Sequence, residues 1–388
     1  MTIGRTTDAI EGRHLTRWWR ALTVALVLLL GLATAGVAGA TPGKGQGGKP
    51  AGKPAAAAQA QGGPPVTVMT RNIYLGSELG GLFAAGTPEL LVEAASEVWA
   101  NVLASDFPAR AEVLADEVDE HRPMLVGLQE VSLFTAKNAA GGSISIDFLE
   151  ILLDALTDAG LHYRAVAVSP SFTGTLPAFD PTLGFVQATL IDRDVILVRS
   201  DVPPAQLTVL DEQVGIFDAA LALPVLGQPL RIDRGWGYVD VRVRNREFRF
   251  VNTHFEAFDP GEFIRVQQAQ ELLDGPLDTD LPVVLLGDFN SNAEAGGLAY
   301  GILIKGGGFE DAWSIANPGD PGLTCCHDAD LRNEDVALRS RIDLILVRDG
   351  VRVRDLERVG IDPAMRTPAG LWPSDHAGVV GRVMITAK

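Results

Sequence analysis

Helical and strand patterns alternate along this chain, and their order limits the folds that it can adopt. An alternating β-branched run at Val66–Ile73 predicts a strand, and a short apolar run at Met124–Leu128 predicts another. Between them, helical stretches run from Thr87-Pro88 to about Ala104 and over Arg110–Arg122. Thr at an N-cap with Pro directly after it is typical of a helix start.

Strands carry most of the second half of the chain. Further helices are expected at Ile146–Ala159 and Gly261–Leu273, and further strands at Tyr163–Val168, Phe185–Leu190, Val195–Val198, Tyr238–Arg244, Phe248–His254, Pro282–Leu286, Ile342–Val347 and Val379–Ile385. Two packed sheets with helices on the outside suit this mixture better than a single parallel sheet. We therefore expect an α/β or α+β fold built on a sheet sandwich.

The N-terminal segment has the pattern of a secretory signal peptide. Arg13, Arg17 and Arg20 precede the apolar run Ala21–Leu32, and small residues follow up to Ala38-Gly39-Ala40. The alternative is an uncleaved membrane anchor, because residues 21–40 are just long enough to span a bilayer. The glycines and alanines at the end of the run favour cleavage. We therefore predict a signal peptide over residues 1–40 and a secreted protein.

Residues 41–65 form a segment of Gly, Pro, Ala, Gln and Lys without periodicity, which predicts a flexible linker. Residues 66–388 are then expected to form one large domain of the size of an enzyme. Hydrophobic residues make up 47% of the chain and charged residues 21%, which excludes wholesale disorder. The net charge of −17 argues against non-specific capture of nucleic acid, although a divalent cation can supply positive charge locally.

Polar residues follow apolar strands at five places. These are Arg71-Asn72, Leu128-Gln129-Glu130, Asn252-Thr253-His254, Gly287-Asp288-Phe289-Asn290 and Ser374-Asp375-His376; a sixth place, Arg341-Ile342-Asp343, has an acid at the start of a strand. One polar residue at a strand end is normally only solvated. Together the six supply four carboxylates, two histidines and the amides of Asn72 and Asn290, which suit a hard cation with acid–base partners.

In this order, the motifs resemble those of the endonuclease/exonuclease/phosphatase superfamily, from Val66 to Ile385. The resemblance rests on Asn near the start, QE, the T-H strand, GDFN, RID and a terminal SDH. It implies a four-layer α/β/β/α sandwich, with two mixed sheets packed face to face and helices outside. It also implies a metal-dependent phosphoesterase.

The resemblance implies a role for each of eight residues. Glu130 is similar to the principal Mg²⁺ ligand of the family, assisted by Asn72, and Asp375 to a second metal or phosphate-side ligand. Asp288 resembles the residue that aligns the attacking water or takes its proton, and Asn290 the donor to a phosphoryl oxygen. Asp343 resembles the acid that orients His376, which contacts the phosphate or acts as acid or base. His254 resembles the second histidine near the phosphate.

The chain also departs from the family pattern. Arg71 stands where many members have Trp, and Tyr74 stands where some nucleases have Asp. No carboxylate partner for His254 is evident from the sequence. For Cys325 and Cys326, partly buried thiols are favoured over a bond between neighbours, because adjacent Cα atoms lie about 3.8 Å apart, below the usual disulfide range.

The sequence therefore predicts an exported, Mg²⁺-dependent hydrolase of phosphodiesters or phosphomonoesters, with Mn²⁺ and Ca²⁺ as alternative ions. A sphingomyelinase-type phospholipase C and an extracellular nuclease are narrower forms of this hypothesis. A catalytically silent binding module on the same fold is the alternative from another class. The expected substrates are a phospholipid headgroup, a nucleic acid or an inositol phosphate. No protein partner is indicated, and a monomer is expected.

Overall fold

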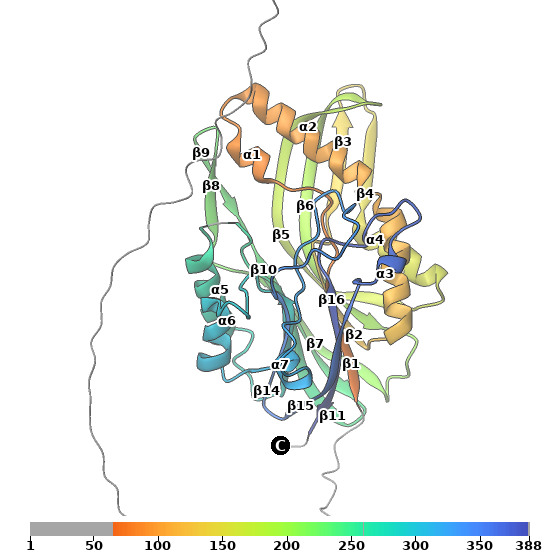
Figure 1. Ribbon diagram of the computed structural model, residues 1–388, viewed down its shortest axis with the longest axis vertical. Coiled ribbons are helices and arrows are strands. Elements are labelled where there is room, and N and C mark those ends of the chain that lie inside the picture. The colour runs from red at the N-terminus through yellow and green to blue at the C-terminus, as the bar shows by residue number, and fades with distance from the viewer. Residues whose placement is uncertain (1–64, 259, 387–388) are drawn as a thin grey trace, which may run out of the picture. The chain divides into compact units, whose positions relative to one another are not determined.

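Two β-sheets face each other in this computed structural model, and helices cover their outer faces (Figure 1). The structure describes residues 65–258 and 260–386. The predicted signal peptide, the alternative anchor and residues 41–64 of the predicted linker lie outside this range. No helix within the described residues is long and apolar enough to cross a membrane.

The first sheet has eight strands. In spatial order they are β15 (Val351–Val359), β16 (Gly378–Ile385), β1 (Val66–Asn72), β2 (Leu125–Gln129), β6 (Gly184–Arg199), β3 (Leu133–Asn138) and β4 (Ser143–Asp147), with β5 (Tyr163–Asp180) also paired to β6. β1 and β2 run parallel, and the other pairs are antiparallel. The sheet is therefore mixed, as expected.

The second sheet has six strands. Their order is β13 (Glu310–Asp311), β14 (Asp343–Arg348), β12 (Val283–Asp288), β11 (Arg246–His254), β10 (Gly235–Val243) and β7 (Leu207–Ile216). It too is mixed, because only β11 and β12 are parallel. A separate two-stranded ribbon consists of β8 (Leu221–Val225) and β9 (Gln228–Ile232).

Helices lie on both outer faces. On the first sheet they are α2 (Pro88–Ala104), α3 (Phe107–His121) and α4 (Phe148–Asp158); on the second they are α5 (Glu262–Asp274), α6 (Leu298–Gly301) and a π-helical turn at Ile302–Gly306. The short helices α1 (Gly80–Ala84) and α7 (Ala312–Ala316) and a 3₁₀ turn at Pro363–Met365 lie in connections.

Side-chain alternation along β12 shows how the layers are held together. Val284 and Leu286 pack between the sheets, whereas Val283 and Leu285 pack toward the helices of the second sheet. This period of two is what a strand buried on both faces requires. The expected four-layer α/β/β/α sandwich is confirmed.

Two expectations about elements need correction. The predicted strands Phe185–Leu190 and Val195–Val198 are parts of one strand, β6, and the predicted strand Tyr163–Val168 extends to Asp180. The polar stretch between the two predicted strands does not break β6, because Ser132 Oγ donates to Asp192 (2.8 Å) and Ser171 Oγ donates to Asp194 (3.1 Å). By contrast, the expected start of α2 is correct, since Thr87 accepts a hydrogen bond from Leu90 N–H.

Candidate active site

Strand register brings the predicted site residues to one edge of the sandwich. In the first sheet Asn72 is paired with Gln129, so Glu130 follows directly beside it. In the second sheet Asp288 is paired with both His254 and Asp343. Because parallel strands end at the same edge, residues distant in sequence become neighbours there.

Gly287, in the GDFN motif, allows two of these strands to lie close together. Its φ is +144°, and a Cβ atom at this position would collide with the carbonyl oxygen of Thr253. Only glycine tolerates both conditions. The motif thus begins with a residue that the backbone needs, before the residues that carry the chemistry.

Asn72 connects carboxylates from the two sheets. Its Nδ2 donates to Glu130 Oε1 (3.0 Å) and to Asp288 Oδ2 (3.2 Å), while its Oδ1 accepts from Tyr74 N–H. Glu130 also accepts from Leu75 N–H at 2.7 Å. In this arrangement Asn72 orients the Glu130 carboxylate, and its role as a metal ligand stays a prediction.

His376 and Asp343 form a buried pair. His376 Nδ1 lies 2.8 Å from Asp343 Oδ2, and its Nε2 lies 3.9 Å from Asp288 Oδ2 and 4.0 Å from Asp375 Oδ1. Burial alone would lower the pKa of His376, but the charge of Asp343 outweighs it and holds this pKa well above the usual value. The second nitrogen of the imidazole therefore points at two further carboxylates.

Asp288 and Asn290 adjoin each other at the end of β12. Asn290 N–H donates to Asp288 Oδ1 at 2.9 Å, and Asn290 Nδ2 donates to the carbonyl of Phe255 at 3.1 Å. Burial and the charge of Asp343 raise the pKa of Asp288. Asn290 has a φ of 47° and Glu130 a φ of 60°, a left-handed backbone that is uncommon outside glycine and that often marks functional sites.

The structure also places partners for His254 that the sequence did not reveal. His254 Nδ1 lies 3.7 Å from Asp194 Oδ1 and 3.4 Å from Arg234 Nη1, and its Nε2 lies 3.6 Å from Asp288. Burial and Arg234 oppose protonation, yet Asp194 raises the pKa of His254. The sequence signal that could have indicated a carboxylate near His254 is Asp192-Arg193-Asp194, which places two acids on one face of the strand.

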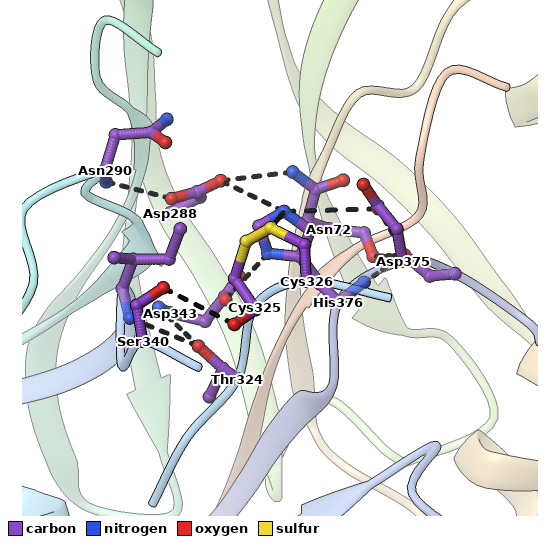
Figure 2. The surroundings of a disulfide bond; sticks show 12 residues. Asn72, Asp288, Asn290, Thr324, Cys325, Cys326, Ser340, Asp343, Asp375 and His376 are labelled. Carbon is purple, nitrogen blue, oxygen red and sulfur yellow. Dashed lines mark hydrogen bonds and ion pairs between the residues drawn. A yellow bond between two sulfur atoms is a disulfide. The ribbon is translucent and has the colours of Figure 1, made fainter. Parts of the chain in front are cut away.

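These groups surround a cavity of about 370 Å³. Its polar lining includes Glu130, Asp192, Arg234, His254, Asp288, Asn290, Asp375 and His376. Asn72 and Asp343 do not line it, and they hold the lining residues from behind. Figure 2 shows Asn72, Asp288, Asp343, Asp375 and His376 gathered around one point.

The carboxylates in this cavity fit a divalent cation. Burial and the neighbouring charge of Glu130 raise the pKa of Asp375 to about 7, although His376 acts in the opposite direction. Burial also opposes ionisation of Glu130, but the charge of His254 and the hydrogen bond from Asn72 lower its pKa overall. Glu130 and Asp375 are half-buried carboxylates whose charges repel each other, and carboxylate oxygens are the donors that Mg²⁺, Mn²⁺ or Ca²⁺ prefers.

Cys325 and Cys326 form a disulfide at the wall of this cavity, so the expectation of thiols is wrong (Figure 2). Cys325 makes β-bridges to both Ser340 and His376, and the Sγ of Cys326 lies 3.9 Å from His376 Nε2. These bridges hold the cysteine segment beside the imidazole.

Known proteins share this architecture. The sequence model of the Endonuclease/Exonuclease/phosphatase family matches residues 98–376, which is more than half of the chain. No relative is found among curated protein sequences.

Solved structures of low sequence identity are similar. An endonuclease/exonuclease/phosphatase family protein from Leptotrichia buccalis C-1013-b has a TM-score of 0.50 at 15% identity, with 82% of this chain and 99% of that one covered. The endonuclease/exonuclease/phosphatase from Bacteroides vulgatus has a TM-score of 0.49 at 20% identity, covering 83% and 100%. The human Nocturnin catalytic domain has a TM-score of 0.49 at 17% identity, with 83% of this chain and 95% of that one covered. On the match to the family model, the chain belongs to the endonuclease/exonuclease/phosphatase family.

Proposed function

We propose that this protein is a divalent-cation-dependent hydrolase of phosphate esters. One observation carries the proposal: His376, held by Asp343, presents its Nε2 to Asp288 and Asp375 in the cavity that Glu130 also lines. A carboxylate-bound imidazole that faces two further carboxylates is suited to proton transfer beside an anionic phosphate.

Glu130 and Asp375 would hold the cation, with Asn72 orienting Glu130. When bound, a divalent cation neutralises charge on the phosphate and so lowers the barrier to attack by water. Mg²⁺ is the expected ion, with Mn²⁺ and Ca²⁺ as alternatives.

The other residues manage protons and position the ester. As water attacks phosphorus and the ester P–O bond breaks, Asp288 accepts a proton from water and His376 supplies one to the leaving alkoxide. His254 is suited to contact a phosphate oxygen. Asn290 Nδ2 already donates to Phe255, and its second hydrogen remains for a phosphoryl oxygen.

A catalytically silent binding module on this fold is less well supported. Such a module would be expected to have lost one of the groups that manage charge or protons. Here both imidazoles, with a carboxylate close to each, and both candidate metal ligands come together around one cavity.

The N-terminal sequence supports a secreted protein, and we propose that the mature chain begins near Thr41. N-terminal sequencing of the exported protein tests this directly. A membrane-bound form that retains Arg17 and Arg20 would instead show that residues 21–40 serve as an anchor.

Activity is tested with the full chain against DNA, RNA, sphingomyelin and phosphorylated inositols in Mg²⁺. Hydrolysis of at least one ester, its loss in excess chelator and its return on adding Mg²⁺ are expected. His376→Ala should abolish this activity, whereas His162→Ala, at an exposed histidine outside the cavity, should leave it unchanged. Equal hydrolysis by wild type with and without chelator would contradict the proposal.

A further inference from the structure

A second cavity of about 300 Å³ lies beside the cavity lined by Glu130, Asp288 and His376, which is called the catalytic cavity below. The two differ in chemical character. The walls of the second cavity are almost wholly apolar. Val98 and Trp99 of α2, Ala188 and Leu190 of β6, and Leu230 of β9 are among the residues that line it. The β8–β9 ribbon lies next to α1, at the upper left of Figure 1, and closes one side. The volume is in the range of pockets that bind small molecules.

The two cavities adjoin. Leu79, Phe83, Phe172 and Leu190 line both of them. The ring of Phe83 also packs edge-on against Phe258 of the catalytic cavity, with centroids 5.0 Å apart. The side chains shared by the two cavities are all apolar, so a ligand that reaches from the carboxylates and imidazoles into the apolar cavity passes no polar group among them.

An apolar cavity next to the polar one discriminates among classes of phosphate ester. An inositol phosphate is polar throughout, and the charged backbone of a nucleic acid is costly to bury away from water. Neither gains from an apolar cavity. An aliphatic chain gains free energy roughly in proportion to the surface that it buries.

We propose that the substrate is an amphiphile, a phosphate ester whose headgroup occupies the catalytic cavity and whose aliphatic chain fills the apolar cavity. The inference rests on the proposed function and names its substrate class. A chain that contacts the protein equally in the ground state and the transition state lowers KM and leaves kcat nearly unchanged.

The test uses p-nitrophenyl alkyl phosphodiesters with methyl, hexyl and dodecyl chains, each below its micelle concentration and in Mg²⁺. The reacting centre is the same in all three. From methyl to dodecyl, KM should fall by at least about tenfold, with kcat changing by less than about threefold. A KM that is independent of chain length would overturn the inference.

Matched variants locate the effect in the cavity. Ala188→Trp should fill the apolar cavity and raise KM for the dodecyl ester by about tenfold, whereas KM for the methyl ester should not change. Gln187→Trp is the control, because Gln187 is the preceding residue of β6 and is exposed. Equal KM values for the dodecyl ester in the two variants would contradict the assignment.

A second pair keeps the test decisive if Ala188→Trp does not fold. Leu230→Asp places a charge in the cavity wall, and Ala222→Asp places one on an exposed position of the same ribbon. Only Leu230→Asp should raise KM for the dodecyl ester. If all chain lengths are hydrolysed equally well, the proposed function stands and the inference fails. If no ester is hydrolysed with Mg²⁺, Mn²⁺ or Ca²⁺, both fail.

Discussion

The Asp343–His376 pair is the residue-scale feature on which the proposed chemistry depends most. Asp343 is 1% exposed, and its Oδ2 lies 2.8 Å from His376 Nδ1. Asp343→Asn and His376→Ala should each lower kcat by about 10²–10⁴-fold. Because the two act as one unit, the double variant should be little worse than the more damaged single variant.

A double-mutant cycle on kcat, with unfolding curves for each variant, measures this coupling. Multiplicative losses in kcat would show that Asp343 and His376 act independently. A nearly normal Asp343→Asn enzyme would show that Asp343 serves only the fold.

Glu130 carries the second residue-scale prediction. Glu130→Gln keeps the shape of the side chain and can still accept from Leu75 N–H, but it removes a negative charge that a cation needs. Calorimetric titration with Mn²⁺ should show affinity reduced by at least about tenfold, together with lower activity. Glu150→Gln, at an exposed position on α4, is the control and should bind the ion like wild type. Unchanged Mn²⁺ affinity in Glu130→Gln would place the cation elsewhere.

Particular residues show how far sequence reasoning reaches. The eight predicted site residues come together, because ordered motifs at strand ends follow directly from strand register. Asp194, the carboxylate near His254, was missed because it lies inside β6, where the charged stretch was read as a gap between strands. The solvated ribbon β8–β9 was missed as well, since its side chains are largely exposed and carry no strong hydrophobic alternation.

At the scale of elements, a buried ion pair joins β1 to α3 and to the segment before β16. Arg71 Nε and Nη2 each lie 3.0 Å from a carboxylate oxygen of Glu117, and Arg71 Nη1 donates to the carbonyl oxygen of His376. Both side chains are almost fully buried. Arg71, which replaces the Trp common in the family, therefore helps to hold the backbone of His376.

Glu117→Gln should destabilise the protein by about 3–5 kcal/mol, because it leaves the Arg71 guanidinium buried without its countercharge. Urea unfolding measures the change, and Glu112→Gln, exposed on the same helix, should change stability by less than about 0.5 kcal/mol. Replacing both partners, as Arg71→Met with Glu117→Leu, should recover much of the loss in stability. If Glu117→Gln unfolds like wild type, the pair does not stabilise this junction.

At the scale of the whole molecule, the site depends on the distance between the two sheets. Asn252 of β11 spans the gap: its Nδ2 donates to the carbonyl of Leu128 (2.9 Å), and its Oδ1 accepts from Gln129 Nε2 (2.6 Å). Glu130 follows Gln129 in one sheet, and His254 follows Asn252 by two residues in the other. The contact between the sheets therefore lies directly beneath the catalytic cavity and sets the separation of its two halves.

Gly127 makes this close approach possible. A Cβ atom there would collide with Leu286 Cδ1 and would lie 2.6 Å from Asn252 Oδ1. Gly127→Ala should therefore push the sheets apart, lowering stability by about 1–3 kcal/mol and reducing kcat with Mg²⁺. Gly86→Ala is the control, because a Cβ atom there meets nothing within 4 Å. Urea unfolding and steady-state kinetics are measured on both variants. If Gly127→Ala is as stable and as active as Gly86→Ala, sheet separation does not set the geometry of the site.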